Sequence, residues 1–286
     1  MSTDKVQAQQ RDTGDDRQSL TRPASPTKPP LSYEELRDVI DLSLWAGQML
    51  LQHGAESQRV EETVHHLGTG LGCDWMDILV SPNAIIVTTT SGHEFRTKTR
   101  RVVRLGADLW RITAVNDLSR RVSQGELDRS QVRHELERID ATPPRYHRWL
   151  VVFMVGLACA AFSRLFGGNW PVFVVTFVAA TVAMLVRQEL TRRYFNQFLV
   201  TVASAFVAGV LAASATRLNL SPQPEVALIS AVLLLVPGVH LINSAEDLIK
   251  GHLVTGITRG AMGFLITLAI ALGLLLALRL MGVDGL

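Results

Sequence analysis

The sequence has very little cysteine, and this scarcity already excludes one class of protein. Its 286 residues contain two cysteines, Cys73 and Cys159. Two cysteines cannot make the dense disulfide framework on which small secreted domains depend. Cys159 also lies in an apolar run, so we expect both to be buried, unreactive thiols.

Charge is scarce in the second half of the chain. Of the 54 Lys, Arg, Asp and Glu residues, only 13 lie between Trp149 and Leu286. The first 148 residues carry a net charge of −1 and the remainder +3. Neither half has the dense positive field of a nucleic-acid-binding protein. The 48% hydrophobic content excludes a chain that is disordered throughout.

Two further signals are missing from the sequence. The first thirty residues are polar and rich in proline, without the apolar stretch of a signal peptide. We therefore expect residues 1–30 to be a disordered cytoplasmic tail. No Gly-x4-Gly-Lys-Ser/Thr pattern is present, so ATP-driven pumping is not expected.

Residues 31–145 predict a small cytoplasmic α+β domain, with helices packed on a short antiparallel sheet. Ser32 and Glu35 have the spacing of a capping box, which predicts that a helix begins there. The periodicity predicts helices over about 31–54, 55–67, 109–124 and 130–139, and strands over about 77–80, 84–90 and 93–103.

Residues 146–286 predict a transmembrane domain of five helices. The apolar runs cover about 149–166, 170–186, 195–216, 226–242 and 257–281. Each is long enough, or nearly so, to cross about 30 Å of hydrocarbon. If the N-terminal domain is cytoplasmic, the inside ends carry seven basic residues (Arg145, Arg148, Arg187, Arg192, Arg193, Lys250 and Arg259) against three outside (Arg164, Arg217 and Arg279). This asymmetry predicts a cytoplasmic N-terminus and a C-terminus on the outer side.

The fourth apolar run holds the residues best suited to a transport site. Pro237 and Gly238 interrupt it, and a broken helix is tolerated in a membrane only where it is buried or lines a wet cavity. Transporters use the ends of such half-helices to hold ions. Asn243, Asp247 and Lys250 share one face after the break.

Three further residues complete this candidate pathway. His240 lies inside or near the hydrocarbon, Arg259 lies on the return into the fifth span, and Arg187 lies near the inner face. Intramembrane ionisable residues are costly, which favours a pathway role. The alternative is a packing kink with an Asp247–Lys250 pair at the membrane interface.

The N-terminal half offers weaker candidates. Arg59 has Glu56 three residues before it and Glu62 three after it, so these are either surface helix pairs or a cluster that couples the domain to the membrane spans. His53 and Ser57 suggest a hydrolytic pair, but no nucleophile elbow accompanies them, and catalysis is not expected. His65 and His66 lack ligand partners at metal spacing, so neither a metal nor a cofactor is expected.

Several segments together resemble the threonine/serine exporter family. They are His53-Gly-Ala-Glu-Ser57 with Val60-Glu-Glu62, Ser81-Pro-Asn83 with the following strand, Arg145-Tyr-His-Arg-Trp149, and Leu233-Leu-Leu-Val-Pro237-Gly238 with Leu241, Asn243, Asp247, Lys250, Gly256 and Arg259. The resemblance covers about residues 31–281 and is strongest at the proline-glycine stretch. One departure is His240, where the family pattern favours proline or another small residue.

The resemblance implies a function and a partner. Full-length members of the family add a second set of spans, so a five-span chain is expected to work with a separate small, YjjB-like membrane subunit in a hetero-oligomer. That two-component type is associated with succinate export, and single-chain relatives export threonine and serine. We therefore expect a bacterial inner-membrane exporter of a small carboxylate, most closely succinate. The alternatives are threonine/serine export, a membrane-anchored hydrolase that uses the N-terminal domain, and a membrane protein without transport activity.

Overall fold

The computed structural model describes residues 28–102, 106–143, 145–217 and 224–282. The chain divides into two compact units, one ending at Thr142 and one beginning at Pro143. Each unit is described by itself below. The tail expected over residues 1–30 falls, up to residue 27, outside the described residues.

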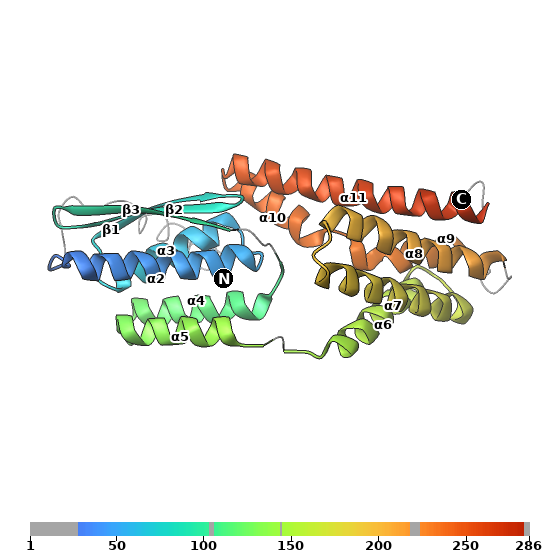
Figure 1. Cartoon of the computed structure of the whole chain (residues 1–286), viewed down its shortest axis with the longest axis horizontal. Helices are drawn as coiled ribbons and strands as arrows, with labels where there is room; N and C mark the ends of the chain where they lie inside the picture. Colours follow the sequence, from blue (N-terminus) through green and yellow to red (C-terminus); the bar gives the residue numbers. More distant parts are fainter. Residues whose placement is uncertain (1–27, 103–105, 144, 218–223, 283–286) are drawn as a thin grey trace, which may run out of the picture. The chain divides into compact units, whose positions relative to one another are not determined.

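The N-terminal unit has three layers. The strands β1 (Trp75–Ser81), β2 (Ala84–Ser91) and β3 (Glu94–Arg101) form an antiparallel sheet in the order β1-β2-β3. The helices α2 (Tyr33–Gln52) and α3 (Ser57–Gly70) cover one face of it, and α4 (Leu109–Ser123) and α5 (Arg129–Ala141) pack on the other side of these helices (Figure 1).

Local sequence signals account for these elements. The Ser32 side chain accepts from the Glu35 amide and the Glu35 carboxylate accepts from the Ser32 amide, which confirms the predicted capping box. In β2, every second residue from Ile85 to Ser91 is buried, because one face of the sheet packs on α2 and α3.

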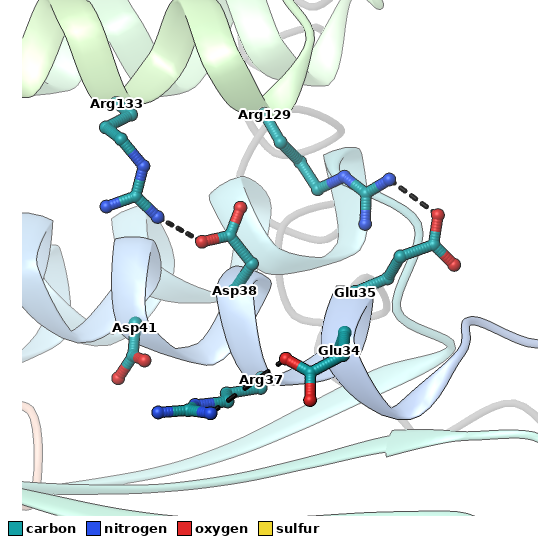
Figure 2. Close-up of a pocket in the computed structure, with 7 residues that line it drawn as sticks. All are labelled: Glu34, Glu35, Arg37, Asp38, Asp41, Arg129 and Arg133. Atoms are coloured by element: carbon teal, nitrogen blue, oxygen red, sulfur yellow. Dashed lines mark hydrogen bonds and ion pairs between the residues drawn. The ribbon is translucent and has the colours of Figure 1, made fainter.

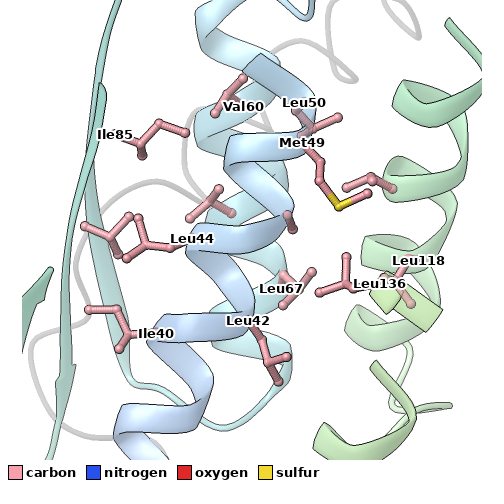
Figure 3. Packing of buried hydrophobic residues seen from close by; sticks show 14 of the residues in the cluster. Ile40, Leu42, Leu44, Met49, Leu50, Val60, Leu67, Ile85, Leu118 and Leu136 are labelled. Atoms are coloured by element: carbon pink, nitrogen blue, oxygen red, sulfur yellow. The ribbon is translucent and has the colours of Figure 1, made fainter. Parts of the chain in front are cut away.

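The helix α2 is buried on two sides, since it lies between the sheet and the pair α4–α5. Figure 3 shows Ile40 and Leu44 on the side of the strands, whereas Leu42 and Met49 lie on the side of α4 and α5. Side chains of this size, each at most 2% exposed, make the core of the N-terminal unit. Cys73 belongs to this core, so the expectation that its thiol is buried is confirmed, and burial raises the pKa of this thiol to about 11.

The C-terminal unit is helical in all its described regular elements. It contains α6 (Arg148–Leu165), α7 (Trp170–Arg192), α8 (Gln197–Arg217), α9 (Pro224–Val232), a short 3-10 helix (Leu233–Leu235), α10 (Gly238–Ile249) and α11 (Leu253–Met281) (Figure 1). Among the described residues, four helices are long and apolar enough to cross a membrane: α6, α7, α8 and α11.

The fourth predicted run differs from a single straight span. Residues 225–235 and α10 are bent by 64° against each other at the break, so together they form either a broken span or a re-entrant loop. The predicted break is confirmed at Pro237, and the half-helix that follows it begins at Gly238 and continues to Ile249. Proline lacks the amide needed to continue the hydrogen-bond ladder, which explains the position of the break.

Candidate functional site

A tight turn at Pro237 interrupts the helical hydrogen-bond ladder. Pro237 has φ −81° and ψ 53°, and the Gly238 amide donates to the Val236 carbonyl over 2.9 Å. This is the geometry of an inverse γ-turn. The helical ladder resumes when the Leu241 amide donates to the Pro237 carbonyl over 3.1 Å.

Arg187 of α7 compensates for the broken ladder. In a continuous helix the Leu234 carbonyl would accept from Gly238, or from residue 237 in a 3-10 turn. Pro237 has no amide hydrogen and the Gly238 amide is already used by Val236. The Leu234 carbonyl instead accepts from Nη1 of Arg187 over 2.8 Å. The predicted site residue Arg187 therefore binds directly to the break.

A buried ion pair joins α10 to α11. Nη1 of Arg259 donates to Oδ2 of Asp247 over 2.7 Å. The Asp247 side chain is 0% exposed and that of Arg259 is 13% exposed. A charge-assisted hydrogen bond of this length is strong, but each charge depends on its partner because water is excluded. Asp247 and Arg259 are thus two residues of the predicted pathway that the structure brings into direct contact.

Small residues allow α10 and α11 to approach closely enough to bury this pair. A Cβ atom at Gly256 would lie 2.8 Å from the Leu248 side chain, and one at Gly260 would lie 2.8 Å from Oγ of Ser244. That hydroxyl donates to the Gly256 carbonyl over 2.7 Å. Glycine at both positions therefore sets the separation of the helices, and Ser244 fixes their register.

The other predicted residues surround this contact less directly. His240 and Asn243 are half-buried on α10. Lys250 is the C-terminal cap of α10, and its Nζ lies 2.8 Å from Oε1 of Glu246. Arg259 was expected on the return into the last span, but it lies inside α11, which begins at Leu253.

The predicted coupling residues form local pairs on α3. Arg59 lies 3.6 Å from Glu56, the N-terminal cap residue, whose side chain is only 9% exposed. Glu62 accepts a hydrogen bond from Gln58 one turn earlier. Contacts of this type stabilise a helix by about 0.2–0.5 kcal/mol each.

The geometry around His53 disfavours hydrolytic chemistry. Nη1 of Arg111 lies 3.0 Å from Nε2 of His53, and because arginine only donates, Nε2 must accept. That nitrogen is therefore engaged rather than available to a serine hydroxyl. Burial, and then the charge of Arg111, lower the pKa of His53 below its usual value. Arg111 also donates to the Thr142 carbonyl over 2.9 Å, so it ties the end of the N-terminal unit to α2.

A charged pocket of about 500 Å³ lies between α2 and α5, which the sequence did not indicate. Figure 2 shows Arg129 and Arg133 reaching from α5 toward Glu35 and Asp38 of α2. The other lining residues are Glu34, Arg37 and Asp41. These carboxylates are matched by guanidinium or ammonium groups, with Asp41 bound to Lys98. The pocket is therefore an ion-pair network that joins α2 to its neighbours.

Metal binding finds no support in the part of the chain that the structure describes. No group of three or more His, Cys, Asp or Glu side chains there could hold a metal ion. His65 is buried, with Nδ1 3.3 Å from the Met76 carbonyl and its ring against Trp75. It is a packed core histidine.

Comparison with known proteins, like the broken helix, indicates a transport protein. The family model described as "Putative threonine/serine exporter" matches residues 41–281. The chain is 41% identical to "Probable succinate transporter subunit YjjP" of Klebsiella aerogenes, over 88% of this chain and 97% of that protein. It is 39% identical to the protein of the same name in Escherichia coli, over 89% of this chain and 99% of that protein.

A more distant relative is named for different substrates. The "Threonine/serine exporter" of Corynebacterium glutamicum is 23% identical over 90% of this chain, which corresponds to 55% of that protein. No solved structure matches.

Proposed function

Because the chain belongs to the threonine/serine exporter family, we propose that it is the larger subunit of a secondary transporter that exports a small carboxylate, most closely succinate. The relatives of 39–41% identity that cover nearly their whole length are named as succinate transporter subunits. The four apolar helices and the bent pair are those of a multi-pass membrane protein.

The buried Asp247–Arg259 pair carries this proposal. A charge inside a membrane protein is costly, so a buried pair between the half-helix that follows the break and α11 needs either a use or a structural role. Its position after a proline break resembles the discontinuous helices from which transporters build ion and substrate sites. The proposed pathway consists of the break with its flanking polar residues (Arg187, Pro237, Gly238, His240, Asn243, Asp247, Lys250 and Arg259).

In this proposal, the sides of the membrane on which the two termini lie depend on whether the bent helix pair counts as a fifth span. With four straight spans alone, both termini would lie on one side of the bacterial inner membrane. If the bent pair crosses as a fifth span, the N-terminus is cytoplasmic and the C-terminus periplasmic, as the distribution of basic residues favours. Glu56, Arg59 and Glu62 then belong to the cytoplasmic domain and are proposed to couple it to the spans.

The proposed partner is a small YjjB-like membrane subunit in a hetero-oligomer. The word "subunit" in the names of the relatives supports a second component. Many transporters build their central site between two repeated halves, and five spans supply one such half. Lipid is expected on the outward faces, where large apolar side chains such as Phe153, Leu272 and Phe264 are exposed.

Two alternatives remain testable. Threonine/serine export is favoured by the distant relative of that name. A membrane-anchored hydrolase is disfavoured by the Arg111–His53 contact.

The experiment is uptake into inverted vesicles that contain the chain with and without the small subunit. Succinate, threonine and serine are compared at equal concentration. The proposal expects succinate uptake only when both subunits are present. Preferential uptake of threonine, or full uptake without the small subunit, contradicts it.

A further inference from the structure

A second cavity, in the C-terminal unit, has arginines in its lining, although most of its surface is apolar. Its volume is about 620 Å³, and it is formed by the beginning of α6 and the last turns of α7. Its lining residues are Arg148, Met184, Arg187, Gln188, Thr191 and Arg192. Three arginines therefore line one space.

The positive charge of this cavity is only partly balanced. Glu189 is shared, since it lies 3.9 Å from Arg148 and 3.0 Å from Arg193. Among the described residues no carboxylate pairs with Arg187 or Arg192. Of the three lining arginines, only Arg148 thus has a carboxylate partner among the described residues, which leaves an excess of positive charge.

The cavity also has an unfilled hydrogen-bond donor. Nε of Arg148 is buried and has no acceptor among the described residues. Leaving a buried donor without an acceptor costs about 1–3 kcal/mol, and more for a charged group. Arg187 uses one donor on the Leu234 carbonyl, and a guanidinium group has five. An anion with two or three oxygens would supply the acceptors.

The N-terminus of α6, which lies at this cavity, also suits an anion. Arg148 is the first residue of α6, and the preceding cap residue, His147, makes no side-chain hydrogen bond to the first turn. The positive end of the helix dipole therefore adds to the arginine charges. Arg187 lies five residues before the end of α7, which is about 7.5 Å along the helix, so the cavity lies at one end of α7.

We infer that this cavity binds an oxyanion, a carboxylate or a phosphate group, through Arg148, Arg187 and Arg192. The inference shares Arg187 with the proposed pathway, but it concerns binding alone, and the test below measures binding without transport. The oxyanion comes either from a dissolved metabolite such as a dicarboxylate or from the head group of an anionic lipid. The competing interpretation is that the arginines only anchor the ends of α6 and α7 at the interface.

The test uses the full-length chain in nanodiscs of zwitterionic lipid. Succinate and inorganic phosphate are titrated at constant ionic strength. Binding is read as a change in tryptophan fluorescence that a Trp149→Phe variant lacks, because the Arg148 guanidinium lies 5.2 Å from that ring. A parallel arm measures the retention of phosphatidylglycerol after purification. The test variant combines Arg148→Gln with Arg192→Gln and leaves the Arg187–Leu234 contact intact.

The matched control combines Arg193→Gln with Arg164→Gln, which removes two positive charges, as the test variant does, and each single variant is measured beside it. Arg193→Gln changes the neighbouring arginine, which does not line the cavity, and Arg164→Gln changes the opposite end of α6. Melting temperatures of all variants are compared to exclude misfolding. The Arg148→Lys, Arg192→Lys variant keeps the charge and removes the planar fork of donors.

The inference expects that binding of at least one oxyanion weakens about tenfold or more in the Gln test variant, with intermediate weakening in the Lys variant. The controls should bind as the unchanged protein does. Loss of succinate or phosphate binding identifies a dissolved anion, and loss of phosphatidylglycerol alone identifies a lipid head group. Equal binding by test and control variants, or binding of no oxyanion in either arm, overturns the inference.

Discussion

The side chains that the two units bury differ in size. In the N-terminal unit the buried cluster consists of large residues such as Leu42, Leu50 and Leu136. In the C-terminal unit the buried cluster is dominated by small residues (Ala179, Ala183, Ala205, Ala208 and Ala231), while many large apolar side chains are exposed. Water drives large apolar groups inward, whereas lipid does not, so close backbone packing holds membrane helices together instead.

The units also differ in how they treat charge. The ion pairs between α2 and α5 are partly open to solvent, with the Arg133 and Asp38 side chains 46% and 35% exposed. The Asp247–Arg259 pair is almost fully enclosed. The Arg133–Asp38 ion pair should therefore stabilise the N-terminal unit only slightly, because solvent screens it. Removing one partner of the Asp247–Arg259 pair should strongly destabilise the C-terminal unit, because solvent does not reach that pair.

The largest effect on stability is expected from Arg259→Ala. The change leaves the Asp247 carboxylate buried without its guanidinium partner, which should cost about 3–5 kcal/mol. Equilibrium unfolding in detergent measures this loss. The double variant Asp247→Ala, Arg259→Ala should recover part of it, and a double variant as unstable as the single one would show that the charge pairing is not the cause.

A smaller loss is expected from overpacking the helix interface. A Cβ atom at Gly273 of α11 would lie 2.5 Å from the Val202 carbonyl and 2.7 Å from the Ala205 side chain on α8. Gly273→Ala should therefore destabilise the C-terminal unit by about 1–3 kcal/mol, measured by thermal unfolding. Gly167→Ala is the control, because no atom lies within 4 Å of the added Cβ there. Any loss in this control comes from backbone strain, since the φ of Gly167 is 84°. A harmless Gly273→Ala change would disprove close packing of α8 on α11.

The pH dependence of the N-terminal unit gives a third test. The pKa of His53 is lowered by burial and by Arg111, so the unfolded chain binds a proton first as the pH falls. The stabilisation is complete above the unfolded pKa of about 6.5 and is lost as the pH falls toward the folded pKa. His53→Gln keeps an acceptor for Arg111 and removes this titration. Melting the two proteins at several pH values should show a steeper acid loss for the unchanged chain, and parallel curves would contradict this account.

The smallest effect is expected from Arg133→Ala. Because its ion pair with Asp38 is partly exposed, the change should cost at most about 1 kcal/mol. The loss should also shrink in high salt, which screens exposed charges. A cost comparable to that of Arg259→Ala would remove the distinction between the two units.

Local signals in the sequence predicted much of the fold. The capping box at Ser32 and Glu35 and the alternation of β2 are confirmed, because each depends on residues within a few positions. The helix break was also predictable, since proline acts on its own turn. The boundaries of α10 and α11 were less accurate, because turn residues such as Gly251, with φ 89°, decide them.

The sequence did not predict which residues contact one another in the candidate site. Twelve positions separate Asp247 from Arg259, and their contact depends on the close approach that Gly256 and Gly260 permit. The contact of Arg187 with the Leu234 carbonyl spans 47 positions and depends on how α7 packs against the break. Periodicity identifies which face of a helix a residue occupies, but not which residue of another helix meets it.

The central claim is that the enclosed pair belongs to the transport pathway, and adjacent residues of α10 allow a matched test. Succinate uptake into inverted vesicles is measured for Asp247→Asn and for Glu246→Gln, whose side chain is more exposed and pairs with Lys250. Both variants are compared at equal membrane levels with the small subunit present. The account predicts loss of uptake for Asp247→Asn and near-normal uptake for Glu246→Gln. Normal uptake by both variants would contradict it and would make the break a packing kink.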